Sequence, residues 1–239
     1  MDSVPTVMRL ALRQLWFTYR LVPIIGLPVL AGLLLQAVPL EATELGPVGG
    51  AGHWLAVGLA VAFPVIGATA AATIAAERRR GTMGWLVVRA VPRSGVLIGW
   101  FGAFGLLVAG GLGVGAIATW FGALDRTPTI PDALPFSVAS AAMLAVGCAS
   151  IATGLLFGLL LRPIPAFAVT LTICAAFLGL SVIGPFPDGL PPVAVMAVLS
   201  DLERGTTPVA EAVRGAGTAL AASAALLLMA SAVADRLDL

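Results

Sequence analysis

Few residues of this chain have the type and spacing that chemistry needs. The one histidine, His53, has no cysteine or carboxylate at the spacing of a metal site. Cys148 and Cys174 both fall within apolar runs, where a small buried side chain is expected rather than a disulfide or a metal ligand. Neither an HExxH nor a GxSxG motif occurs. The sequence therefore predicts that the chain is not an enzyme, with no catalytic, metal-binding or cofactor-binding residues of its own.

The composition points to a membrane protein. Of the 239 residues, 59% are hydrophobic and only 10% are charged, and the mean hydropathy is +1.05. Soluble domains carry about 25% charged residues. The formal net charge of +1 gives no reason to expect a nucleic-acid partner. These values predict an all-α polytopic membrane protein that forms a single transmembrane domain over 1–239 and contacts the lipid bilayer directly.

Six stretches reach or approach the roughly 20 apolar residues that a membrane-spanning helix needs, and none contains a charged residue. They are about 21–40, 54–76, 95–121, 137–161, 166–184 and 215–234. Pro28 and Pro64 fall inside the first two and are expected to kink them. Glycine pairs four residues apart, Gly111/Gly115 and Gly154/Gly158, are expected to mark faces where helices pack closely.

The segment 7–20 predicts an interfacial helix ahead of the first span. Its basic residues favour one face, and its apolar and aromatic residues favour the other, as in helices that lie along lipid headgroups. The basic set is Arg9, Arg13 and Arg20, and the other set is Met8, Leu12, Leu15, Trp16 and Tyr19. The alternative is a frayed start of the first span.

The arginines set the predicted orientation. With the N-terminus inside, the inner segments hold ten arginines and the outer segments only Arg126, Arg204 and Arg214. An excess of positive charge marks the cytoplasmic side, so both termini are predicted to be cytoplasmic. The protein is placed in the plasma membrane, the inner membrane of a bacterium, because its basic residues are all arginine and it is rich in alanine and glycine, which suggests a GC-rich genome.

The three outer connections are expected over 41–53, 122–136 and 185–214. The second carries three prolines and predicts a turn without regular structure. The third predicts a re-entrant or interfacial helix between Pro191 and Leu199, which is too short to span. A second short helix is expected to begin near Pro208 with Thr207 as its cap.

The most distinctive stretch is 77–93, between the second and third spans. It holds five of the thirteen basic residues of the chain. Thr82 can cap a short helix that Pro92 would end, with an apolar stripe at Met83, Leu86, Val87 and Ala90. An ordinary positively charged loop would explain the arginines but not the stripe, which should be covered by a partner.

The energy for any transport should come from outside the membrane. The predicted spans contain no ionisable residue that could carry a coupling ion. The chain also has no GxxxxGK[ST] phosphate-binding loop, so ATP would have to be hydrolysed by a separate polypeptide.

The stretch 77–93 resembles the signature that follows the second span in membrane subunits of ABC-2-type transporters, the six-helix permease family of ABC exporters. That signature has an acidic residue, basic residues, Gly-Thr, a hydrophobic residue, and then Pro and a basic residue. The matching positions are Glu77, Arg78, Gly81, Thr82, Leu86, Pro92 and Arg93. The family's outer loop before the last span is similar to Pro208, Val209, Ala212, Arg214 and Gly215.

The resemblance implies a coupling helix at about 82–91 that docks into a separate ABC ATPase subunit, which forms a dimer and binds ATP and Mg. It assigns ATPase coupling to Glu77, Gly81, Thr82, Leu86, Val87, Pro92 and Arg93, and an outer-loop role to Pro208 and Arg214. It also implies a second membrane subunit, identical or homologous. The expected activity is efflux of a hydrophobic or amphipathic compound such as a drug, antibiotic or lipid, which would give antibiotic resistance. The alternative is a non-transporting membrane scaffold or assembly factor.

Overall fold

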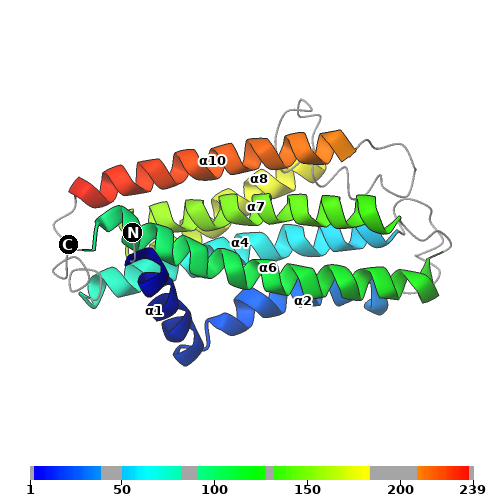
Figure 1. The fold of residues 1–239 in the computed structure, drawn as a ribbon, viewed down its shortest axis with the longest axis horizontal. Helices are drawn as coiled ribbons and strands as arrows, with labels where there is room; N and C mark the ends of the chain where they lie inside the picture. Colours follow the sequence, from blue (N-terminus) through cyan, green and yellow to red (C-terminus); the bar gives the residue numbers. More distant parts are fainter. Residues whose placement is uncertain (1–2, 39–49, 82–90, 128–131, 184–208, 237–239) are drawn as a thin grey trace.

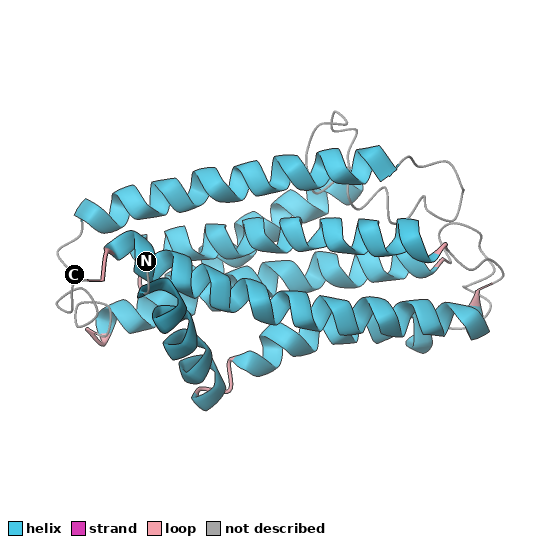
Figure 2. Cartoon of the chain, viewed as in Figure 1, coloured by secondary structure: helices cyan, strands magenta, loops and turns pink. Residues whose placement is uncertain are grey.

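A computed structural model describes residues 3–38, 50–81, 91–127, 132–183 and 209–236. The described part is built of helices and contains no strand (Figure 2). The helices are α1 (Ser3–Phe17), α2 (Leu21–Ala37), α4 (Ala51–Arg79), α6 (Arg93–Arg126), α7 (Ala133–Leu160), α8 (Pro163–Ile183) and α10 (Val209–Arg236).

Six of these helices form an elongated bundle, and α1 crosses it obliquely (Figure 1). Helix α7 lies at the centre, because it packs against α4, α10, α6 and α8. Helix α4 covers one side of α7 and also contacts α2 and α8, whereas α6 packs mainly against α2 and α1. The start of α1 and the end of α10 lie at the same end of the bundle.

The apolar helices identify a polytopic helical membrane protein. Four of them are long and apolar enough to cross a bilayer: α4, α6, α7 and the part of α10 from Ala212 to Arg236. Helix α2 has 17 residues, and Pro163–Leu178 of α8 is a further apolar helix. Each of the six predicted spans overlaps one of these helices. By length and composition, four helices of the described part can cross a membrane, or five if α1 and α2 together form one bent span.

The N-terminal segment is helical rather than frayed, and it is bent sharply away from the first predicted span. The axes of α1 and α2 form an angle of 81°. Thr18 ends α1 by donating its hydroxyl to the carbonyl of Gln14 at 2.8 Å. The next residue, Tyr19, has a φ of 55°, a left-handed conformation that turns the chain sharply at a cost for any residue except glycine.

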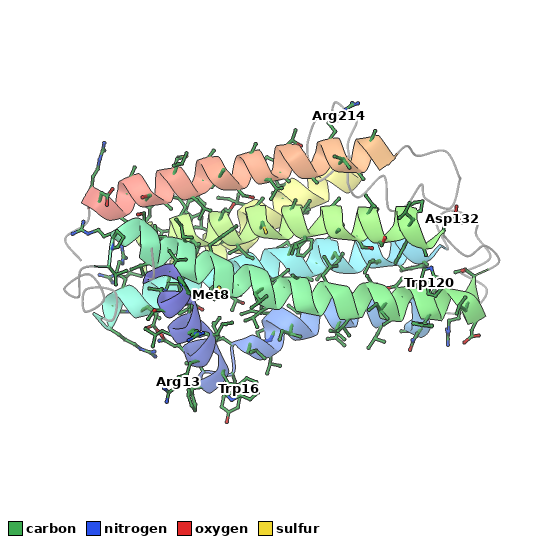
Figure 3. The ribbon with its side chains drawn as sticks, in the orientation of Figure 1. Met8, Arg13, Trp16, Trp120, Asp132 and Arg214 are labelled. Carbon is green, nitrogen blue, oxygen red and sulfur yellow. The ribbon has the colours of Figure 1, made fainter. Side chains whose placement is uncertain are left out.

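The faces of α1 differ from the sequence prediction. The buried stripe consists of Val7, Ala11 and Leu15, and Val7 lies against Gly99 of α6. Trp16 and Tyr19, which were predicted to share the apolar face with Leu15, are exposed (Figure 3). The reason is that one face of α1 packs on α6, so the aromatic residues are left on the outer surface beside the arginines.

The helices extend beyond the apolar runs from which the spans were predicted, and this corrects two connections. Helix α6 continues to Arg126 and α7 begins at Ala133, so most of the irregular connection predicted over 122–136 is helical. Pro135 is tolerated there because the first turn of a helix needs no partner for its N–H. Polar residues at the ends of a span can therefore remain helical where hydropathy predicts a loop.

A second correction concerns the last helix. Helix α10 runs without a break from Val209 to Arg236, so the short helix predicted after Pro208 and the span predicted over 215–234 are one element. The interfacial segment predicted over 191–199, together with Thr207 and Pro208, lies outside the described residues.

The glycine pairs do mark close packing, as predicted. A Cβ at Gly158 would lie 2.7 Å from the carbonyl oxygen of Ala71, and one at Gly154 would collide with the carbonyl of Gly67. On α6, a Cβ at Gly111 would lie 2.7 Å from the carbonyl oxygen of Ile25. Small residues thus allow α4 to approach α7 and α2 to approach α6 at backbone distance. Helices α2 and α4 continue through Pro28 and Pro64.

Candidate functional site

The sequence-predicted coupling residues surround one connection, between α4 and α6. Glu77 and Gly81 lie at the end of α4, and Pro92 and Arg93 lie at the start of α6. The residues predicted to form the docking helix, Thr82, Leu86 and Val87 among them, fall within 82–90, outside the described residues. The structure therefore describes the two flanks of the connection, and the site is built from these flanks.

Gly81 ends α4 in a way that requires glycine. Arg80 closes the last turn, and the N–H of Gly81 donates to the carbonyl of Arg78 at 3.2 Å. The φ of Gly81 is +74°, a left-handed conformation that is common just after a helix and favours glycine. The glycine of the predicted motif thus has a structural reason, since it directs the chain out of α4 and into the connection.

The other flank is set by proline. Pro92 has an extended backbone, with φ −62° and ψ 141°, immediately before the first residue of α6. Its carbonyl accepts the N–H of Val96 at 3.1 Å and so begins the helix. The connection between Gly81 and Pro92 is therefore bounded on both sides by residues whose backbone conformation fixes a helix end.

Glu77 is the buried charge of this region. It is 1% exposed, and no other charged side chain of the described residues is buried. One carboxylate oxygen, Oε1, pairs with Arg80 at 3.2 Å, while Oε2 has no hydrogen-bond partner among the described residues. Partial burial lowers the pKa of Arg20 from its ordinary value, and the negative charge of Glu77 opposes that shift. Glu77 therefore lies within electrostatic reach of the turn that joins α1 to α2.

Arg78 connects the end of α4 to the end of α7. Its guanidinium donates to the carbonyl oxygens of Leu159 and, at 3.0 Å, of Leu161. These carbonyls belong to the last turn of α7, where helix carbonyls lack intrahelical partners and where positive charge is favoured.

Arg93 makes the corresponding link on the other flank. Its Nη1 donates to the carbonyl oxygens of Ala234 and Asp235, both at 2.9 Å, in the last turn of α10. The two arginines that bound the connection are thus each bonded to the C-terminal end of a different long helix. The sequence predicted that both arginines orient the protein, and the family resemblance added ATPase coupling for Arg93, but no spacing signal in a single sequence identifies a carbonyl partner 141 residues away.

The second predicted group lies at the opposite end of the bundle. Arg214 is exposed on the second turn of α10 rather than in a loop (Figure 3). Because α10 reaches Arg93 only at its far end, the structure does not bring Arg214 near Glu77. At the same end as Arg214, Arg126 donates to the carbonyl of Val38 at 3.0 Å and joins the end of α6 to the end of α2.

The polar side chains within the described helices bond mainly to their own backbone. Most hydroxyls bond to the carbonyl one turn earlier, as Thr69 does to Val65 and Thr73 does to Thr69. His53 stacks edge-on against Trp54, with ring centroids 5.7 Å apart. No group of three or more His, Cys, Asp or Glu residues that could hold a metal occurs within the described ranges.

Comparison with models of protein families gives no match, and comparison with curated proteins gives none either.

Proposed function

We propose that this chain is the membrane-spanning subunit of an ABC-2-type exporter, in which a separate subunit hydrolyses ATP. The observation that carries the proposal is the pair of arginine links beside the connection between α4 and α6. Arg78 ties one flank to the end of α7, and Arg93 ties the other flank to the end of α10. A partner that moved this connection would act on four helices at once.

The mechanism follows from these links. An amphipathic segment at about 82–91 docks into the ATPase, and closure of two ATPase subunits around ATP and Mg displaces it. Gly81 and Pro92 set the helix ends on either side of the segment. A displacement of the segment is therefore transmitted to α4 and α6. Hydrogen bonds to carbonyls at helix ends then carry it to α7 and α10.

The buried Glu77 supports the same proposal. Its charge lies under Arg80 and within reach of Arg20, so the end of α4 is coupled electrostatically to the turn after α1. A buried carboxylate with an unpaired oxygen is costly. We expect Glu77 to be retained because it holds the base of the coupling segment, together with the arginine-rich surface around it, in one arrangement.

The complex is expected to contain two such membrane subunits, identical or homologous, with both termini in the cytoplasm of a bacterial cell. The described arginines gather at the end of the bundle where α4 ends and α6 begins, with Arg126 and Arg214 at the other end. This distribution favours the cytoplasm for the first end. A hydrophobic or amphipathic substrate is favoured because the long helices are apolar.

The experiment is co-expression of the chain with a candidate ABC ATPase, followed by co-purification of the two, in wild type and in Leu86→Asp. The aspartate places a charge in the predicted docking stripe, which should cost about 2 kcal/mol or more and lower the affinity roughly 30-fold. Val88→Asp is the matched control, since this position lies outside the predicted stripe.

The expected outcome is that Leu86→Asp inserts normally, loses the ATPase and abolishes the stimulation of ATP hydrolysis, whereas Val88→Asp retains both. Equal co-purification of the two variants would refute the coupling segment. An ATPase that binds but whose hydrolysis never responds to the membrane chain would favour a scaffold or assembly factor instead.

A further inference from the structure

An apolar cleft of about 590 Å³ lies between α7, α8 and α10. Helix α7 forms its floor, because it packs against both of the other helices, while the described residues of α8 and α10 make no extended contact with each other. The α10 wall is formed largely by small side chains, Ala219, Ala222 and Ala225. The cleft therefore opens sideways from the bundle, between α8 and α10.

The cleft lies at the depth of the membrane interior. Ala222 is midway along the 28 residues of α10, about 20 Å from either end at 1.5 Å per residue. Water is not available at that depth to fill a hollow. An empty hollow would also deprive its walls of van der Waals contacts, so the cleft should be filled by hydrocarbon.

The hydroxyl groups that line the cleft already have hydrogen-bond partners within α7, so a bound molecule need not supply any. Thr153 donates its hydroxyl to the carbonyl of Ala149 at 2.8 Å, and Ser150 donates to Val146 at 3.3 Å. The volume falls within the range of about 300–1,000 Å³ found for ligand pockets. A slender chain without hydrogen-bonding groups fits these walls better than a polar or branched molecule.

The surroundings indicate where such a chain would be attached. Phe157, at one edge of the cleft, precedes the exposed Arg162 by five residues. Arg236, which ends α10, is exposed at the same end of the bundle. A phosphate group at the level of these arginines would leave its hydrocarbon chain directed along α7 into the cleft.

We propose that the cleft binds one acyl chain of a membrane phospholipid, which enters laterally between α8 and α10. This site is separate from the connection between α4 and α6, and it requires no ATPase. Lipid binding in the cleft therefore does not depend on the proposed transport function, and an experiment that refutes one of them leaves the other standing.

The test uses the purified full chain alone, in nanodiscs of phosphatidylcholine and phosphatidylglycerol whose acyl chains carry a diazirine near their middle. After illumination, mass spectrometry maps the labelled residues. The expected result is label concentrated on the cleft faces of α7, α8 and α10. Label distributed evenly around α10 would overturn the proposal without any variant.

Two variants on the same helix sharpen the test. Ala222→Trp fills the middle of the cleft and should lower labelling of its walls several-fold. Ala221→Trp is the control, because Ala221 is also exposed but does not line the cleft. Both positions tolerate a large side chain, since neither is buried. Equal loss of label in the two variants would overturn the assignment.

The same design tests a different occupant. With Cys148 and Cys174 replaced by alanine, Ala222→Cys provides a single thiol in the cleft. Rapid cross-linking between two copies through this thiol, with no lipid label in the cleft, would assign the cleft to a second copy of the chain and overturn lipid binding. Absence of such cross-linking, together with lipid label, supports the proposal.

Discussion

The close crossing of α2 and α6 permits a matched pair of substitutions. A Cβ at Gly115 would collide with the carbonyl oxygen of Pro28 and lie 3.1 Å from its carbonyl carbon. All of these opposing atoms belong to the backbone, so no side chain can rotate away and α2 itself must shift. Gly113 lies on the same helix, and a Cβ there would meet no atom within 4 Å.

We expect Gly115→Ala to lower the free energy of unfolding by about 2–3 kcal/mol, at the upper end of the range for overpacking in a tight core. Gly113→Ala should raise it by about 0.5–1 kcal/mol, because alanine is the better helix former and meets no obstacle. The two variants therefore differ by about 3 kcal/mol, a factor of more than 100 in the unfolding equilibrium.

The assay is reversible unfolding in mixed micelles of a mild detergent and dodecyl sulfate, followed by the fluorescence of the tryptophans. The free energy of unfolding should rise in Gly113→Ala and fall in Gly115→Ala. A general effect of adding a methyl group to α6 would change it in the same direction in both variants. Equal shifts for Gly113→Ala and Gly115→Ala would show that α2 and α6 do not approach at Gly115, and the reasoning about this crossing would be wrong.

Three further substitutions test individual contacts. Thr119→Val removes the hydrogen bond to the carbonyl of Gly32 at 2.9 Å while keeping the side-chain shape, so unfolding in the same micelles should show a loss of about 0.6–1 kcal/mol; no loss would mean that this bond adds nothing. Gly81→Ala forces an alanine into the left-handed conformation and should lower the free energy of unfolding by about 1–2 kcal/mol, which is measured as a lower melting temperature. An unchanged melting temperature would contradict the positive φ of Gly81. Arg93→Gln should increase amide hydrogen exchange in the last turn of α10, because the hydrogen bonds from Arg93 to two backbone carbonyls there are lost. Exchange at the start of α10 serves as the internal control and should stay unchanged.

The sequence was sufficient to locate the helices but not to predict the residues at which they begin and end. Each of the six apolar runs overlaps a helix of the described residues, because a run of about 20 residues without charge has few other uses. It placed the connection at 122–136 too broadly, since polar residues next to a span can continue a helix by satisfying their own backbone. The glycine spacing located the α4–α7 and α2–α6 contacts, because only glycine permits backbone approach there.

The links between distant helices were beyond sequence reasoning. Arg78, Arg93 and Arg126 were all counted as charges that orient the chain, and Arg78 and Arg93 also matched the family signature, but each bonds to a backbone carbonyl at the end of another helix. Every residue has a backbone carbonyl, so the sequence does not show which residue accepts such a hydrogen bond. The burial of Glu77 was hidden for a similar reason, because the packing of α4 against its neighbours, rather than the local sequence, removes that carboxylate from solvent.

These links also determine which parts of the bundle could move together. Arg78 and Arg93 join the two flanks of one connection to α7 and α10, and α7 and α10 are two of the three walls of the apolar cleft. By contrast, α2 and α6 are fixed to each other by backbone contact at Gly115 and by the Thr119 hydrogen bond. A force on the connection between α4 and α6 would therefore reach α7 through Arg78 and α10 through Arg93, while α2 would move together with α6. We expect Arg93→Gln, which frees the end of α10 from the start of α6, to alter diazirine labelling of the cleft, while the stability difference between Gly113→Ala and Gly115→Ala persists in that background.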